Sequence, residues 1–290
     1  MLKNISIAVV VLALIGAAFV WFISDRDRGL LVLTTALKVS NPIETVDDIA
    51  YGDESWQKLD VYPQAAAAPV VVFIHGGSWR HGRKDQYRFA ADAFYRQGYT
   101  VVLPDYVKYP ETQAKYPSFA VDGAKAIAWV KNNIAQYNGK AEQVFVAGHS
   151  AGAHTALMLS VDKQFLNAEG LAPADLLGVI GIAGPYSFIP DWEVTQAVFG
   201  PPENYPLMDA LNYVDGDEPS TLLLHSAADQ QVGQYNQEKL AAALESKSVD
   251  VTAVYYKTLG HIDMVTHLHP WFEKEDSLMD DINTFIKQRI

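Results

Sequence analysis

The sequence predicts an α/β fold in which a mostly parallel sheet is covered by helices on both faces. Beyond about residue 45, short runs of apolar and often β-branched residues alternate with longer amphipathic stretches. The short runs are apolar throughout, as expected for strands that are buried on both faces. No internal repeat or Ser/Gly-rich linker interrupts this part of the chain. We therefore expect one domain over residues 45–290.

The expected strands and helices follow from these two patterns. Apolar runs predict the buried strands Val70–Ile74, Thr100–Leu103, Val144–Ala147, Val179–Ala183 and Thr221–Leu224, and Val249–Tyr256 is also strand-like. Amphipathic stretches predict the helices Asp85–Gln97, Phe119–Tyr137, Ala153–Ser160, Gln237–Leu244 and Leu278–Ile290. In a parallel α/β sheet, ligands bind beyond the carboxyl ends of the strands. The residues after each strand are therefore the candidates for function.

Composition excludes several classes of protein. The 290 residues are 49% hydrophobic and 19% charged, which indicates a folded chain with a sizeable core. The absence of Cys excludes disulfide scaffolds, cysteine-zinc sites and thiol nucleophiles. A net charge of −12 without a visible basic patch argues against binding of nucleic acid.

The amino-terminal segment has a different character from the rest of the chain. Residues 5–23 are apolar except for Ser6, and about 20 helical residues cross a bilayer core of roughly 30 Å. We expect residues 1–25 to form an uncleaved membrane anchor and residues 26–44 to connect it to an exported catalytic domain. The alternative is secretion after cleavage of a signal peptide near Gly16–Ala18. Basic residues flank the apolar run on both sides, so the charge bias does not decide its orientation.

The most specific motif is Gly148-His149-Ser150-Ala151-Gly152, between a predicted strand and a predicted helix. In this context the G-x-S-x-G pattern forms a tight turn that exposes the serine hydroxyl. The N–H of Ala151 would begin the helix and face a developing oxyanion. The motif therefore predicts that Ser150 is a nucleophile.

A serine nucleophile needs a base and a group that orients the base. Asp229 follows the strand Thr221–Leu224, and His261 lies in a loop after the strand-like Val249–Tyr256. This chain order of Ser, Asp and His is the order found in hydrolases with a G-x-S-x-G turn. Histidine ionises near neutral pH, so His261 can accept and return the serine proton while Asp229 holds its tautomer. Asp263 competes for the acid role, but it lies only two residues from His261.

A second set of oxyanion donors is expected after the strand Val70–Ile74, where the sequence continues His75-Gly76-Gly77-Ser78-Trp79. Glycine lets the backbone approach a substrate oxygen closely. The N–H groups of Gly77 and Ser78 are the expected donors. We expect His75 to brace this loop.

Together these motifs resemble the α/β-hydrolase fold, in the esterase/lipase branch with an HGG oxyanion loop. The resemblance extends to relatives of hormone-sensitive lipase, kynurenine formamidase and bacterial feruloyl-esterase-like proteins, and covers most of residues 45–290. It implies Ser150, Asp229 and His261 as the triad and Gly77, Ser78 and Ala151 as the oxyanion donors. The chain departs from the hormone-sensitive-lipase pattern at Ser78, where a third Gly is usual. Further segments that support the resemblance are Tyr51-Gly52, Gln57–Tyr62, Leu103–Tyr106, Tyr109–Glu111, Tyr116-Pro117 and Asp122.

Several residues are expected to shape or border the site. Residues 184–219 are rich in aromatic residues and Pro and lie where such enzymes insert lid elements. Residues expected to line a substrate cleft are Trp79, Tyr106, Tyr186 and Trp192.

The other histidines are expected to have structural roles. His149 and His154 are expected to pack or bond locally. The pair His267 and His269 lacks a third ligand in sequence reach, so we expect a surface loop rather than a metal site.

The sequence thus predicts a membrane-tethered serine carboxylesterase that acts on small or aromatic acyl esters without cofactor or metal. One alternative is an amide or formamide hydrolase that uses the same triad. Another is a binding protein on the same fold with an inert triad. The acyl and alcohol groups of the substrate and the oligomeric state are not fixed by the sequence.

Overall fold

The computed structural model describes residues 43–110, 112, 114–272 and 277–290. Its centre is an eight-stranded sheet with the strand order β1-β2-β4-β3-β5-β6-β7-β8. The strands are β1 (Val46–Ala50), β2 (Lys58–Tyr62), β3 (Ala68–Ile74), β4 (Thr100–Pro104), β5 (Gly139–His149), β6 (Gly178–Ile182), β7 (Thr221–Ser226) and β8 (Val251–Tyr256). Strands β3 to β8 pair in parallel, whereas β2 is antiparallel to both β1 and β4. The predicted mostly parallel sheet is confirmed.

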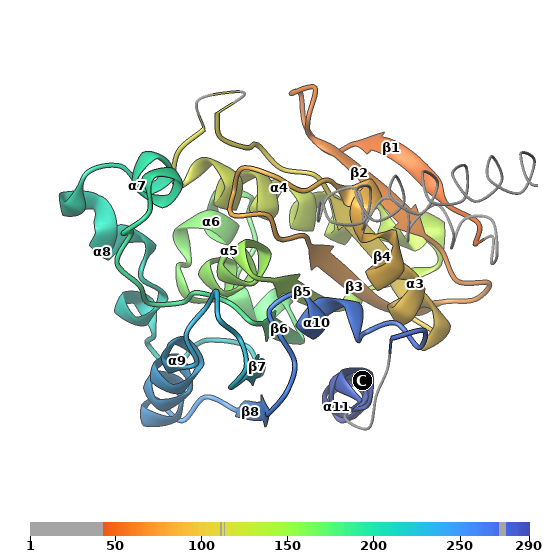
Figure 1. The fold of residues 1–290 in the computed structure, drawn as a ribbon. Helices are drawn as coiled ribbons and strands as arrows, with labels where there is room; N and C mark the ends of the chain where they lie inside the picture. The colour runs from red at the N-terminus through yellow and green to blue at the C-terminus, as the bar shows by residue number, and fades with distance from the viewer. Residues whose placement is uncertain (1–42, 111, 113, 273–276) are drawn as a thin grey trace, which may run out of the picture.

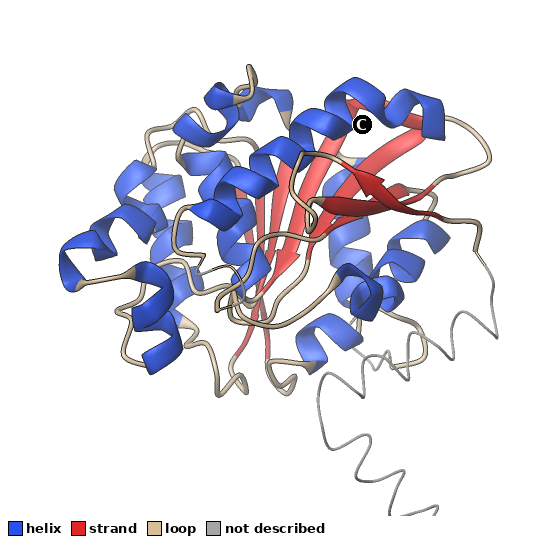
Figure 2. Cartoon of the chain, turned by 90° about the horizontal axis from the view of Figure 1, so that it is seen from above, coloured by secondary structure: helices blue, strands red, loops and turns tan. Residues whose placement is uncertain are grey.

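Helices cover both faces of this sheet (Figure 2). Alternate side chains of β3 enter two different apolar clusters, with Val70, Val72 and Ile74 in one cluster and Val71 and Phe73 in the other. This separation follows from the two-residue period of a strand. The first cluster includes residues of α4 (Ser118–Asn133), α5 (Ala151–Val161) and α9 (Tyr235–Ser246), and the second includes residues of α3 (Arg88–Arg96) and α11 (Leu278–Lys287). Burial on both faces explains why the central strands lack alternation of polar and apolar residues.

The predicted helices are present, with shifted ends. The expected helix Asp85–Gln97 divides into the 3-10 turn η1 (Lys84–Tyr87) and α3, and the chain then turns at Gly98, whose φ is +92°. The expected helix Phe119–Tyr137 is α4 followed by the 3-10 turn η2 (Ile134–Tyr137). Shorter elements complete the chain: α6 (Gln164–Ala168), η3 (Pro173–Asp175), α7 (Glu193–Phe199), η4 (Pro202–Asn204), α8 (Tyr205–Met208), η5 (Ala210–Tyr213) and α10 (Asp263–Thr266).

The sequence patterns did not predict β1 and β2 at the edge of the sheet. Strand β1 has the sequence VDDIA and no buried residue, so it carries no apolar run. In β2, Asp60 is buried and its carboxylate accepts a hydrogen bond of 2.6 Å from Lys84 Nζ. Because Lys84 pairs with the Asp60 carboxylate, the strand can contain a buried acidic residue.

The predicted membrane anchor lies outside the described residues, as does nearly all of the predicted connecting segment 26–44. Within the described part of the chain, no helix is both long enough and apolar enough to cross a bilayer.

Candidate active site

The turn around Ser150 has the geometry of a strained strand-to-helix connection. Strand β5 ends at His149 and helix α5 begins at Ala151, with Ser150 between them at φ 56° and ψ −122°. A non-glycine residue in this region costs on the order of 1–3 kcal/mol and requires support from its surroundings. One such support is the Ser150 N–H, which donates a 2.9 Å hydrogen bond to the carbonyl of Ile182 on β6.

Two glycines of the motif are required by close backbone contacts. A Cβ at Gly148 would lie 2.3 Å from the carbonyl oxygen of Gly152, and a Cβ at Gly152 would lie 2.1 Å from that of Ile74. Both distances are far below van der Waals contact, and the obstructing atoms belong to the backbone. The spacing of glycines in the motif therefore follows from the packing of α5 against β3 and β5.

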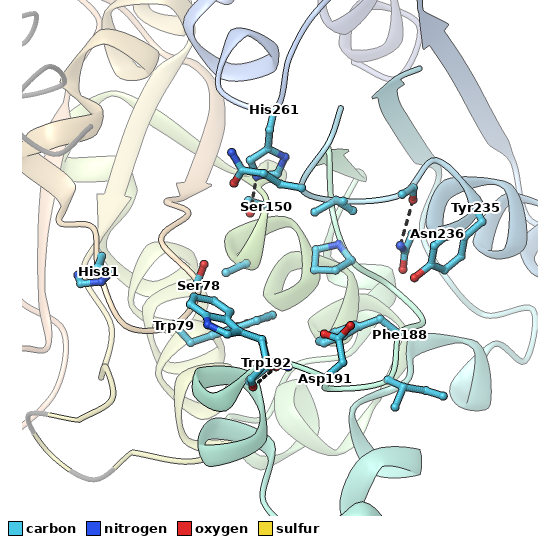
Figure 3. A pocket seen from close by; sticks show the side chains of 17 residues that line it. Ser78, Trp79, His81, Ser150, Phe188, Asp191, Trp192, Tyr235, Asn236 and His261 are labelled. Carbon is cyan, nitrogen blue, oxygen red and sulfur yellow. Dashed lines mark hydrogen bonds between the residues drawn. The ribbon is translucent and has the colours of Figure 1, made fainter. Parts of the chain in front are cut away.

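Ser150, His261 and Asp229 form a continuous hydrogen-bonded chain. His261 Nε2 lies 2.8 Å from Ser150 Oγ, and His261 Nδ1 lies 2.7 Å from Asp229 Oδ2. The contact between Ser150 and His261 is drawn in Figure 3. Asp229 lies in the loop after β7, and His261 lies between β8 and α10. The structure thus brings together the three residues that the sequence singled out, over separations of 111 and 32 positions.

The environment of Asp229 favours its ionised form. Burial alone would raise the pKa of its carboxyl group. The hydrogen bond with His261 and those from the N–H groups of Val232 and Gln231 outweigh burial, so the pKa lies below the ordinary value. A carboxylate held in this way stabilises positive charge on the adjacent imidazole.

Asp263 has a different partner. Its Oδ2 accepts a 3.0 Å hydrogen bond from the N–H of Gly260 and so closes the turn that contains His261. It therefore supports the loop, and Asp229 is the carboxylate that contacts His261.

The loop after β3 borders the same pocket as Ser150. Gly77 has φ +130°, and a Cβ at this position would lie 2.1 Å from the carbonyl oxygen of His81. Ser78 has φ 55° and lines the same pocket as Ser150 and Ala151. Ala151 is the first residue of α5, so its N–H has no acceptor within that helix. Gly77 does not itself line the pocket.

His75 links this loop to the strand next to it. Its ring is buried, with Nδ1 2.8 Å from the carbonyl oxygen of Gly76 and Nε2 3.2 Å from Asp105 Oδ1. Burial lowers the pKa of His75, although the contact with Asp105 opposes that shift. Tyr106 stacks on the ring with centroids 4.5 Å apart and donates a 3.0 Å hydrogen bond to the His75 carbonyl. These contacts correspond to the bracing role expected for His75.

The pocket above Ser150 has a volume of about 810 Å³ and is lined by a mixture of aromatic, aliphatic and polar residues (Figure 3). Trp79 and Trp192 line it, as expected from the sequence. Tyr106 and Tyr186, which were also expected to line it, lie outside the pocket and are buried at 2% and 1% exposure. Tyr106 turns toward His75 instead, and Tyr186 packs over Gly181 and Gly184.

Two further segments that line the pocket were only partly anticipated. The segment between β6 and β7, where a lid was expected, contributes Pro185, Phe188, Ile189, Asp191, Trp192 and Thr195. The acid loop and the start of α9 contribute Gln231, Val232, Gly233, Tyr235 and Asn236, which no sequence motif marked. Asn236 Oδ1 accepts a 3.0 Å hydrogen bond from the Ser187 N–H and thereby joins the two segments.

The expectation of a surface loop at His267 and His269 is wrong, because both side chains are buried. His269 Nε2 lies 2.8 Å from Asp92 Oδ2 on α3, so a distant carboxylate compensates for burial of its polar ring. Among the described residues, no cluster of three or more His, Cys, Asp or Glu side chains could hold a metal ion. His154 is also buried, and its Nε2 contacts the Met208 carbonyl at 2.8 Å, as expected for a local structural role.

A family model places the chain among known proteins. The model of the BD-FAE family matches residues 59–244, which is well over half of the sequence. The chain belongs to the BD-FAE family. The matched range includes Ser150 and Asp229 and ends before His261.

Curated relatives share parts of this range. A probable isoprenylcysteine alpha-carbonyl methylesterase of Oryza sativa subsp. japonica is 32% identical over 149 residues, which are 49% of this chain and 35% of the relative. Esterase LipQ of Mycobacterium tuberculosis is 27% identical over 224 residues, 68% of this chain and 52% of the relative. Kynurenine formamidase of Danio rerio is 32% identical over 123 residues, 41% of this chain and 40% of the relative. The chain thus spans about half the length of the curated relatives it matches, or less.

Solved structures share the fold. An inhibited esterase B from Lactobacillus rhamnosis superimposes with a TM-score of 0.75 at 20% identity, covering 96% of each chain. A truncated carbohydrate esterase from gut microbiota has a TM-score of 0.74 at 18% identity, covering 86% of this chain and 98% of the other. At such low identity these matches establish the α/β-hydrolase fold.

Proposed function

We propose that the protein is a serine carboxylesterase. Ser150 is the nucleophile, His261 the general base and acid, and Asp229 the carboxylate that orients His261. The observation that carries this proposal is the unbroken chain of short contacts from Ser150 Oγ through both nitrogens of His261 to Asp229. Membership of the BD-FAE family and the esterase relatives support the same reaction class.

The proposed residues account for each step of ester hydrolysis. Ser150 Oγ attacks the ester carbonyl carbon while its proton moves to His261 Nε2. The N–H groups of Gly77, Ser78 and Ala151 stabilise the negative oxygen of the tetrahedral intermediate. The intermediate then expels the alcohol, which takes the proton from His261 and leaves an acyl-serine. Water activated by His261 attacks the acyl carbon in the same way, releasing the acid and restoring Ser150.

The lining of the pocket supports small or aromatic acyl esters as substrates. Four aromatic residues, Trp79, Phe188, Trp192 and Tyr235, are among the lining residues, and neither Lys nor Arg is. Aromatic pairs contribute about 0.5–1.5 kcal/mol beyond the burial of their area. We therefore expect aromatic esters to bind more tightly than acetyl esters of the same alcohol.

A formamide or amide substrate is the second candidate, supported by the similarity to kynurenine formamidase. The triad and oxyanion donors would serve amide cleavage equally well. Rates on an ester and its matched anilide or formamide, measured side by side, decide between the two bond types.

Replacement of Ser150 tests the central assignment. Ser150→Ala is expected to lower the rate of p-nitrophenyl acetate hydrolysis roughly 10³-fold or more, because members of a triad act as a unit. A fluorophosphonate probe should label the unmodified protein and not the variant. An unchanged rate in the variant, or an unmodified protein that the probe does not label, would contradict an esterase that uses Ser150 and favour the binding-protein alternative.

We further propose that residues 5–23 anchor the protein in a membrane with the catalytic domain exported. Their uninterrupted apolar sequence supports this proposal.

A further inference from the structure

His149, directly before the proposed nucleophile, contacts the loop that carries the proposed base. Its ring is buried at 1% exposure, and its Nε2 lies 2.9 Å from the backbone carbonyl oxygen of His261. A carbonyl oxygen only accepts hydrogen bonds, so Nε2 of His149 carries the proton and donates it. The two imidazole rings lie 4.8 Å apart at an angle of 41°.

The same side chain also touches the oxyanion loop. A Cβ at Gly76 would lie 3.1 Å from His149 Nδ1 and 2.9 Å from the His149 carbonyl oxygen. Gly76 therefore leaves the space that the His149 ring occupies. One buried imidazole thus contacts the nucleophile turn, the base loop and the oxyanion loop, although it is absent from the pocket lining.

The acid loop has a contact of the same kind. His225, at 0% exposure near the end of β7, has Nε2 3.0 Å from the carbonyl oxygen of Val232. The N–H of Val232 donates to Asp229 Oδ1 at 3.0 Å. The hydrogen bond from His225 therefore closes the loop that holds the Asp229 carboxylate.

We infer that His149 and His225 are positioning residues, which hold the His261 and Asp229 loops at the separations that proton transfer requires. This inference rests on the proposed function, because it concerns the alignment of the same triad. Neither side chain touches the substrate pocket. They act on the backbone of the two loops. Without them, the carbonyl groups of His261 and Val232 would lose these hydrogen bonds.

The misplacement of a catalytic group by about 1 Å can cost roughly 10²-fold in rate. Without the hydrogen bond from His149, the His261 carbonyl must find another donor, and the loop moves with it. Of the loop between β8 and α10, His261 alone lines the pocket, so most of the contacts that bind substrate stay in place. We therefore expect a fall in kcat with little change in KM.

The experiment compares variants that keep or remove the N–H donor. His149→Gln places an amide N–H near the position of Nε2, whereas His149→Leu and His149→Met fill the space without a donor. A fluorophosphonate titration counts active sites, so kcat refers to folded protein only. We expect kcat to fall roughly 10–100-fold in the Leu and Met variants and to recover to within about 5-fold of the unmodified protein in the Gln variant. At His225 we expect the same ranking, with a lower kcat for His225→Leu than for His225→Gln, and a smaller fall in kcat than at His149.

Tyr99→Phe is the matched control. Tyr99 precedes β4 at the end of the sheet opposite Ser150, and its hydroxyl donates a buried 2.9 Å hydrogen bond to Asn283 Oδ1. Removal of this bond should lower the melting temperature and leave kcat per titrated site unchanged. Unchanged kcat in the Leu and Met variants, or a Gln variant no better than these, overturns the inference. Failure of the proposed function is distinct from both outcomes, because the unmodified protein would then not be labelled at Ser150.

Discussion

Several single residues in this site have conformations that their neighbours require. Ser78 and Trp79 both have φ 55°, and Ser150 has φ 56°, so three non-glycine residues of the site have positive φ angles. Strain of this kind persists only where the surrounding structure fixes it. The Ile182 carbonyl bonded to the Ser150 N–H is one such constraint, and the contacts of His75 are another.

The identities of the three triad residues could be predicted from the sequence more readily than the shape of the pocket. Ser150 and Asp229 each follow a strand that an apolar run marked, and His261 follows a strand-like stretch, so their approximate locations follow from the topology of a parallel sheet. The distinction between Asp229 and Asp263 followed from local backbone geometry. By contrast, Tyr106 and Tyr186 were misplaced because a sequence does not show toward which side a tyrosine ring turns after a strand.

The partly buried carboxylate of Asp105 is expected to contribute to the stability of the protein in a pH-dependent way. Burial alone would raise the pKa of its carboxyl group, but contacts with His75, Lys108 and the Lys84 N–H lower it to about 2. A carboxyl group with a lowered folded-state pKa stabilises the protein above its unfolded pKa of about 3.9, and this contribution is lost as the pH falls toward about 2. We expect Asp105→Asn to lower the free energy of unfolding at pH 7 by about 2 kcal/mol.

Urea unfolding at several pH values measures this difference. The difference in free energy of unfolding between Asp105→Asn and the unmodified protein should be constant from pH 5 to pH 7 and should become smaller below about pH 4. Asp85→Asn is the control, because Asp85 forms an exposed ion pair with Arg83 and should change stability by less than about 1 kcal/mol. A difference that stays constant down to pH 2.5 would exclude a lowered pKa of Asp105 as its cause.

The element that gives the pocket its shape is the segment between β6 and β7. Its short helices α7 and α8 lie at one side of the fold, away from the edge strands β1 and β2 (Figure 1). The segment was anticipated as a lid from its aromatic and Pro content, but its helices were not, since each has only four to seven residues. Elements this short depend on tertiary contacts, such as the hydrogen bond from His154 to the Met208 carbonyl.

Trp192 is the residue of this segment through which substrate preference can be tested. It is 51% exposed at the pocket, so its removal leaves little of the core disturbed. Trp192→Ala is expected to raise KM for p-nitrophenyl benzoate about 3- to 10-fold, with a smaller change for p-nitrophenyl acetate, because only the larger acyl group reaches the ring. The ratio of kcat/KM for the two esters measures the effect independently of protein concentration.

A substitution at an exposed tryptophan outside the pocket separates this effect from a general loss of aromatic surface. Trp271 is 52% exposed and does not line the pocket, so Trp271→Ala should leave the ratio unchanged. An equal change in KM for both esters in Trp192→Ala would argue against an aromatic acyl subsite at this residue.

At the scale of the whole molecule, periodicity predicted the parallel part of the sheet and missed its antiparallel edge. Strands β3, β4, β6 and β7 and the second half of β5 are almost entirely buried, so their residues are mostly apolar and apolar runs identify them. The edge strands β1 and β2 are held by polar contacts instead. The Asp48 N–H donates to Asp60 Oδ1 at 2.9 Å, and Lys84 contacts the carboxylates of both Asp48 and Asp60. Contacts between residues this far apart in sequence leave no local pattern.

The arrangement of the whole chain also yields the final prediction, which concerns the apolar residues 5–23. If they form an uncleaved anchor, the full chain should sediment with membranes and resist extraction at alkaline pH, as expected for about 20 apolar residues in a helix. A chain that begins at Ile43, the first described residue, should remain in the supernatant. Its kcat should equal that of the full chain, because all proposed active-site residues lie between Gly77 and His261.

Mass spectrometry of the full-length product distinguishes an anchor from a signal peptide. An intact amino terminus in the membrane fraction supports the anchor, whereas a terminus near Ala17–Phe19 in a soluble product indicates cleavage. Replacement of Leu12 and Leu14 by Arg provides a matched control, since each charge at the centre of a span costs about 2.5–3.5 kcal/mol. The doubly substituted chain should no longer sediment with membranes, and sedimentation that survives this change would show that another surface of the protein holds it there.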